Sequence, residues 1–299
     1  MKINKIIYIA IIATLINSCT REPITDPSAI SSTLDFSTFE VFGNALENQI
    51  AAGDGAGIDN SFRNSGVVID ETDGTYFAVN GVHPVNSGDY TSYYPKSIVK
   101  ASLQTDEIVR AYSFSSINGH EIDMEALSFG PEEGYLYIGD EYNYIYKLNL
   151  ESGEIEQEWD LAKIGVLTST DKGIEAITYS KVTNEFYVGI QDYESVIALT
   201  LHSNGDMTRG DEFAVGESPS GLFAHEDGSI YVLTFSSILR FNTSGANTCT
   251  VSIPEGLGMT RPDGIYIDSS NEYIYIADSQ GPINGGYSMY KILWTQPCD

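Results

Sequence analysis

The sequence contains few basic residues. It has 15 lysines and arginines against 42 aspartates and glutamates, which gives a formal net charge of −27. A chain this acidic is repelled by phosphate backbones, so the charge excludes nucleic acid as a partner. Two explanations of the acidity remain open: it keeps the protein soluble, or it reflects a demand for divalent cations.

Common sequence motifs of catalysis are absent as well. There is no Gly-x-Ser-x-Gly nucleophile turn, no His–Glu zinc motif and no glycine-rich phosphate loop. After the first 18 residues, no run of ten or more residues has a convincing helical period, which argues against a parallel α/β sheet. The sequence therefore indicates an all-β protein and leaves open whether it is an enzyme.

A long hydrophobic run occurs only at the N-terminus. Lys2 and Lys5 stand ahead of an unbroken apolar run over 6–16. This run is too short to cross a bilayer permanently, and a basic start followed by a short apolar stretch is typical of an export signal. We therefore predict a signal peptide over 1–18 rather than a membrane span.

A cysteine directly after the signal adds a sharper expectation. Cys19 follows Ser18, and the segment resembles a bacterial lipobox, with Ile16 at the position where leucine is usual. The resemblance implies that Cys19 carries lipid and anchors the protein to the outer membrane of the bacterial cell envelope, either facing the periplasm or exposed at the cell surface. An ordinary secretory signal is the alternative. The polar residues 19–32 then form a tether to a single domain over 33–299.

Cysteine is scarce, with three in the chain. Once Cys19 carries lipid, Cys249 and Cys298 remain. An exported protein occupies a compartment where disulfides persist, so we expect these two to pair. The alternative is that both stay reduced, since pairing requires their Cα atoms to lie within bridging distance.

What the sequence has instead is a repeat. Each copy opens with a polar and a small residue, continues as a short apolar strand, turns through Asp, Glu, Gly or Asn, and returns as an alternating aromatic and β-branched strand. The copies begin 43 to 60 residues apart and read SGVVIDETDGTYFAVN (65–80), EALSFGPEEGYLYIGD (125–140), EAITYSKVTNEFYVGI (175–190), SGLFAHEDGSIYVLT (220–234) and DGIYIDSSNEYIYIAD (263–278).

A third strand follows most copies, as in YIYKLNL and SILRFN, and a weaker fourth often comes after it, as in IEQEWDL. Four strands per unit at this spacing predict a β-propeller, which we expect to be monomeric. We count five blades, and six if 44–64 forms a degenerate one. No fourth strand follows the last copy, so the stretch 33–43 is expected to supply it and close the ring between the two ends of the domain.

Propeller geometry gathers the start of each first strand and the end of each second strand around one mouth of the central channel. Acidic residues occupy five of these positions: Glu125, Glu175 and Asp263 at the starts, and Asp140 and Asp278 at the ends. Converging carboxylates repel one another unless a cation lies among them, and hard oxygen ligands suit calcium. We therefore expect a calcium site at this mouth. The alternative is that the carboxylates accept hydrogen bonds from backbone N–H groups of neighbouring blades.

Two further groups of side chains are candidates for ligand binding at this mouth. Basic residues precede most blade starts and either pair with the acidic ring or receive an anionic ligand. A long loop over 81–95 overhangs the same face, and 279–287 is its counterpart in the last blade. The residues are Arg63, His120, Lys172 and Arg261 in the first group, and His83, Tyr90, Tyr93 and Tyr94 in the loop.

The segments NSGVVID, IDMEALSFG, KGIEAITYS, SPSGLFAHEDGSIYVLT and RPDGIYID resemble the SdiA-regulated family of propellers, and more distantly the phytase-like and esterase-like propellers. The resemblance covers about 65–280. It implies an envelope location and a divalent metal in the channel, carried over to Glu125, Glu175 and Asp263. The scarcity of lysine and arginine argues against phytase activity, because inositol phosphates need several cations to hold them.

Two hypotheses for function follow. The first is a lipid-anchored, calcium-containing propeller that binds a small molecule or an envelope protein at the channel mouth without turnover. The second is a calcium-dependent hydrolase of an ester, lactone or phosphoester, in which calcium polarises an oxygen and an acidic residue or histidine activates water.

Overall fold

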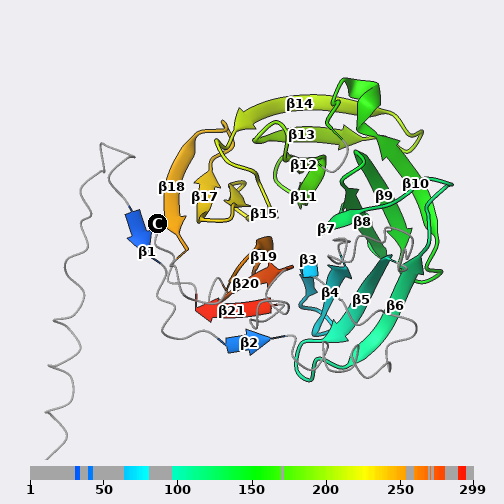
Figure 1. Ribbon diagram of the computed structural model, residues 1–299, viewed down its shortest axis with the longest axis horizontal. Coiled ribbons are helices and arrows are strands. Elements are labelled where there is room, and N and C mark those ends of the chain that lie inside the picture. Colours follow the sequence, from blue (N-terminus) through cyan, green and yellow to red (C-terminus); the bar gives the residue numbers. More distant parts are fainter. Residues whose placement is uncertain are drawn as a thin grey trace, which may run out of the picture.

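The computed structural model describes residues 31–33, 40–42, 64–80, 96–169, 172–253, 259–268, 270, 273–279 and 289–293 of the chain. Apart from a short 3₁₀ helix, η3 (Leu161–Ile164), the regular structure in these ranges consists of β-strands. Within the described part of the chain, no helix is long and apolar enough to cross a membrane. The strands form five sheets that stand around a common centre like the blades of a propeller (Figure 1).

The first three blades each contain four consecutive antiparallel strands. Blade 1 has β3 (Asn64–Asp70), β4 (Thr75–Asn80), β5 (Lys96–Ser102) and β6 (Ile108–Phe114). Blade 2 has β7 (Met124–Phe129), β8 (Tyr135–Asp140), β9 (Tyr144–Asn149) and β10 (Ile155–Asp160). Blade 3 has β11 (Ile174–Ser180), β12 (Glu185–Ile190), β13 (Ser195–Leu201) and β14 (Met207–Ala214).

The last two blades take strands from the N-terminal part of the chain as well. Blade 4 has β15 (Gly221–Ala224), β16 (Ile230–Leu233), β17 (Ser237–Phe241) and β18 (Asn247–Ser252), with β1 (Ser31–Thr33) added in parallel at its outer edge. Blade 5 has β19 (Pro262–Ile267), β20 (Tyr273–Asp278), β21 (Met289–Leu293) and β2 (Glu40–Phe42), which pairs antiparallel with β21.

The expected all-β propeller is therefore confirmed, and it has five blades. The predicted closure is also present, because β2 lies within 33–43 and completes the last blade. Asn64 belongs to β3, and the rest of 44–64 lies outside the described residues. The repeat pattern did not indicate strand β1, which pairs with β18.

The burial of each strand explains why some strands have continuous apolar runs in the sequence and others do not. The innermost strands β7 and β11 are buried along almost their whole length, whereas the outer strand β14 is mostly exposed. Figure 1 shows β3, β7, β11, β15 and β19 at the centre. A strand covered on both faces by neighbouring blades has no polar face, so the period-2 alternation fades toward the centre.

The core is divided among the interfaces between blades. Each of five hydrophobic clusters joins residues of two adjacent blades, and the cluster containing Val67 and Ala277 joins the first blade to the last. Burial of apolar surface at every interface, including this closing one, stabilises the complete ring.

Candidate functional site

A β-bulge places one residue of the innermost strand at the channel mouth in four of the five blades. In four blades the register of the first two strands shifts by one position, between Asn64 and Gly66 in blade 1 and at the matching positions of blades 2, 3 and 5. A bulge leaves its extra residue out of the ladder and turns its side chain. The residues skipped at these four shifts are Ser65, Glu125, Glu175 and Asp263, each at most 2% exposed.

The small residue after each bulge lets the blades meet at the centre. A Cβ on Gly66 would lie 2.8 Å from the backbone oxygen of Glu125, and one on Gly264 would lie 3.0 Å from Cα of Gly66. The backbones of neighbouring innermost strands therefore touch. Below this contact the channel holds a cavity of only about 10 Å³, roughly the space of one water molecule. The channel is thus narrow between the acidic mouth and its other end.

Three carboxylates meet at the blade 2 side of the mouth. One oxygen each of Asp123, Glu125 and Glu141 lies within 4.8 Å of the other two. Glu125 was predicted here, whereas Asp123 and Glu141 were not. The register of the hairpin explains why these two residues join the site. Met124 pairs with Asp140, so the next residues outward, Asp123 and Glu141, also face each other.

The buried carboxylates are poorly compensated by protein donors. Burial raises the pKa of Glu125 well above its ordinary value, and the charges of Asp123, Glu175 and Glu141 add to the shift. Burial and a contact with Glu141 raise the pKa of Glu175 in the same way. One oxygen of Glu125 and one of Glu175 are buried with no hydrogen-bond partner in the described part of the chain. Such oxygens favour a cation or a proton beside them.

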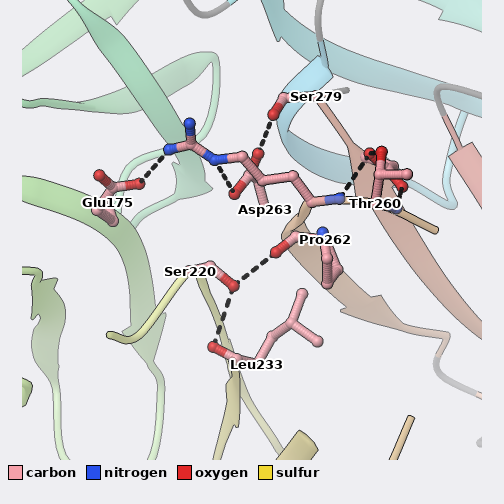
Figure 2. A network of polar contacts seen from close by, with 9 residues as sticks. Glu175, Ser220, Leu233, Thr260, Pro262, Asp263 and Ser279 are labelled. Carbon is pink, nitrogen blue, oxygen red and sulfur yellow. Dashed lines mark hydrogen bonds and ion pairs between the residues drawn. The ribbon is translucent and has the colours of Figure 1, made fainter. Parts of the chain in front are cut away.

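Arg261 supplies positive charge beside Glu175 and Asp263. Figure 2 shows these two carboxylates together with Ser279. The Nε of Arg261 donates to Asp263 Oδ1 at 3.2 Å, and its Nη2 lies 3.8 Å from Glu175 Oε2. The Ser279 hydroxyl donates to the second oxygen of Asp263. Burial nevertheless raises the pKa of Asp263 to about 7, although Arg261 and Ser279 oppose the shift. Both oxygens of Asp263, a predicted metal ligand, therefore already have protein donors.

Asp140 and Asp278 also bind the backbone. Asp140 accepts the N–H groups of Asp123 and Tyr142 at 2.7 and 2.9 Å. Asp278 accepts those of Thr260 and Arg261 at 2.6 and 3.1 Å. Each of these predicted ligands thus fastens the segment entering its blade to the end of the second strand. This is the backbone alternative left open by the sequence, except that the ties lie within one blade rather than between neighbouring blades.

The remaining described candidates, His120 and Lys172, contact residues other than the three clustered carboxylates. His120 stacks on Tyr144 with ring centroids 4.8 Å apart. Lys172 lies 4.0 Å from Asp192, whose carboxylate also accepts hydrogen bonds from Ser169. Arg261 thus forms ion pairs with Glu175 and Asp263 of the acidic ring, whereas Lys172 forms one with Asp192, which is not among the five predicted ring residues.

Several predictions fall outside the described residues. Cys249 is disulfide-bonded, and its partner lies in the part of the chain that is not described, so the pairing with Cys298 stays a prediction. The same holds for lipidation at Cys19 and for the roles assigned to Arg63, His83, Tyr90, Tyr93 and Tyr94.

Comparison with solved structures finds several that are similar to this chain. The glutaminyl cyclase of Myxococcus xanthus superposes with a TM-score of 0.50 at 11% identity, covering 78% of this chain and 92% of the other. Virginiamycin B lyase from Staphylococcus aureus has a TM-score of 0.45 at 13% identity, covering 87% and 74%. The β-propeller domain of Cps50 (Swd1) from Myceliophteria thermophila has 0.45 at 10% identity, covering 73% of this chain and 62% of the other.

The fold is a β-propeller. At these identities the likeness concerns the fold alone, and this chain spans less than two thirds of the length of the Cps50 domain and of the Kuenenia stuttgartiensis hydrazine synthase chain that it also matches. No protein-family model matches the sequence, and neither does any curated protein. The resemblance to the SdiA-regulated family stays a prediction.

Proposed function

We propose that this propeller binds calcium at the acidic channel mouth and uses the charged mouth to hold a ligand or an envelope partner without chemical turnover. The observation that carries the proposal is the unpartnered, buried oxygen on Glu125 beside Asp123 and Glu141. We further propose that Cys19 anchors the domain to the envelope, on the strength of the N-terminal sequence pattern.

The charge balance at the mouth supports a bound cation. Neighbouring carboxylates raise the pKa of Glu125 and of Glu175; they are Asp123, Glu141 and Glu175 for the first, and Glu141 and Asp263 for the second. The only basic side chain that the described contacts place here is Arg261, which pairs with both Glu175 and Asp263. Buried like charges at short range are strongly unfavourable unless a proton or a metal compensates them. A divalent ion compensates two charges at once and supplies a partner for the orphaned oxygens.

The spacing of the carboxylates suits calcium. Two oxygens on one calcium ion lie at most about 5 Å apart, because each Ca–O distance is about 2.3–2.6 Å. The 4.8 Å limit among Asp123, Glu125 and Glu141 falls inside this span.

Burial favours binding over turnover. Glu125 and Glu141 are 2% and 7% exposed, so an ion held between them would have few coordination positions facing solvent. Catalytic metal sites keep a position open for water or substrate.

Titration calorimetry of chelator-stripped protein with calcium chloride tests the proposal. Wild type and the exposed control Glu154→Gln should bind calcium, and Glu125→Gln should not. Absence of binding by wild type would refute the proposal.

One observation favours the second candidate, a calcium-dependent hydrolase. Glu175 is a buried carboxyl with a raised pKa that contacts Glu141, as a general base near a metal would be. Calcium would polarise the substrate carbonyl or phosphoryl oxygen, and Glu175 would take a proton from the attacking water. A screen of lactones, aryl esters and phytate with added calcium decides between the two. Hydrolysis that disappears in Glu175→Gln would establish the enzyme.

A further inference from the structure

A cavity of about 370 Å³ opens at the other end of the channel. Its lining comes from the far halves of all five innermost strands and from the turns that follow them, and includes Val67, Leu127, Tyr179, Leu222 and Tyr266. The volume lies in the range of small-molecule sites, about 300–1,000 Å³. The narrow part of the channel lies between this cavity and the acidic mouth.

Aromatic rings form one corner of this cavity. Phe223 on β15 and Tyr266 on β19 come from adjacent blades, with ring centroids 5.2 Å apart and planes inclined at 73°. The hydroxyl of Tyr266 donates to Glu71 Oε1 at 3.1 Å, which holds its ring in place. Phe129 and Tyr179 line the cavity from blades 2 and 3. Rings that stand at a steep angle can both contact one ligand group.

The charges around the cavity are predominantly negative. Glu226 and Asp268 line it, and Glu71 is bonded to the Tyr266 wall. Lys181 also lines it, and the ring of His225 lies 3.0 Å from an oxygen of Asp227. The net charge of −27 adds a long-range attraction for cations. In the lining, carboxylates outnumber lysine and arginine side chains, and the overall charge disfavours an anionic ligand.

We infer that this cavity binds a small organic cation, an amine or quaternary ammonium group on an apolar body, with the charged group against Phe223 and Tyr266. The faces of aromatic rings attract cations, and the attraction strengthens when the cation leaves water. The aliphatic residues Val67, Leu127 and Leu222 at the floor receive the apolar body. This site does not depend on calcium at the opposite mouth.

Titration calorimetry with benzyltrimethylammonium chloride tests the inference, with benzyl alcohol as the neutral comparison. We expect the cation to bind and the alcohol to bind at least about tenfold more weakly. Phe223→Leu should weaken binding by about tenfold, whereas Phe235→Leu, which changes an exposed ring near Arg261, should not affect it. Equal binding of the two probes, or no binding of the cation, would overturn the inference.

Two variants of Tyr266 make the test independent of folding defects. Tyr266→Phe keeps the ring and loses the contact to Glu71, so binding should persist, whereas Tyr266→Leu should weaken it. Thermal melts of both variants check that the ring of blades remains intact. Glu125→Gln should bind the probe like wild type, which separates failure of this site from failure of the calcium site. Equal affinities of the two Tyr266 variants would contradict a role for the ring.

Discussion

The guanidinium of Arg261 reaches across the channel mouth to Glu175, with Nη2 3.8 Å from Oε2. Arg261 precedes the first strand of blade 5, and Glu175 lies on the first strand of blade 3. These blades are not neighbours in the ring, so the contact is made through the mouth rather than along a blade interface. It ties together parts of the propeller that share no hydrophobic cluster.

Removing this cation should destabilise the protein strongly. Arg261→Met leaves Glu175 and Asp263 buried beside each other without their shared partner, and we expect a loss of about 3–5 kcal/mol in the free energy of unfolding. Arg209→Met is the matched control, because its partner Glu212 is partly exposed and the pair should contribute at most about 1 kcal/mol. Urea denaturation of both variants measures the difference. Equal losses would show that the contact across the mouth is unimportant.

The repeat made the fold predictable. Small residues follow the polar starts because the innermost strands touch at Gly66 and Gly264, so the polar-small pair marks the centre of the ring in the sequence itself. The closing strand β2 was predictable since the last blade lacked a fourth strand. By contrast, β1 is three residues long and pairs with β18 through the backbone, which leaves little trace in side-chain pattern.

The candidate site was predictable only in part. Strand register placed Glu125, Glu175 and Asp263 at equivalent positions, and the bulges bear this out. Register alone does not tell which carboxylates receive protein donors. Asp140 has backbone N–H groups within reach, whereas Glu125 has an oxygen with none. That difference arises from the path of the incoming chain segment, whose backbone N–H group at Asp123 points to Asp140.

The buried carboxyl groups should make the stability of the protein depend on pH. In chelator, Glu125, Glu175 and Asp263 have pKa values above those of the unfolded chain, with Asp263 at about 7. Between the ordinary carboxyl pKa of about 4 and a pH of about 7, the folded protein therefore holds protons that the unfolded chain has released. Stability should rise as the pH falls through this window.

Denaturation midpoints at pH 5, 6, 7 and 8 in chelator measure the slope. Asp263→Asn should flatten the upper part of the curve, since that variant has no carboxyl there to take up a proton. A midpoint that stays constant or increases from pH 5 to pH 8 would show that these groups are already ionised without penalty in the folded state.

The metal content of variants should distinguish carboxylates that bind calcium from carboxylates that only accept backbone hydrogen bonds. Asp140→Asn keeps one acceptor oxygen for the incoming segment, so it should lower stability by about 1–2 kcal/mol while the protein still binds calcium. Glu141→Gln changes a member of the carboxylate cluster and should lower calcium content instead. Elemental analysis of the two purified variants checks this. Loss of calcium in Asp140→Asn but not in Glu141→Gln would show instead that Asp140 is a calcium ligand.

The cysteines make a separate prediction. Peptide mapping of unreduced protein should find Cys249 linked to Cys298, and Cys19 carrying lipid in protein isolated from bacterial membranes. Both follow from one assignment, because a lipid-bearing Cys19 has no thiol left for a disulfide. A peptide that joins Cys19 to Cys249 would contradict both.

Thermal melting with and without calcium tests the central claim most directly. An ion that binds the folded state alone stabilises it by about 2.7 kcal/mol at one hundred times its dissociation constant. Wild-type protein should melt at a higher temperature in calcium chloride than in chelator at pH 7. The Glu154→Gln control should behave in the same way, and Glu125→Gln should show no shift. An unchanged wild-type midpoint, with no metal in the purified protein, would contradict the proposed calcium site.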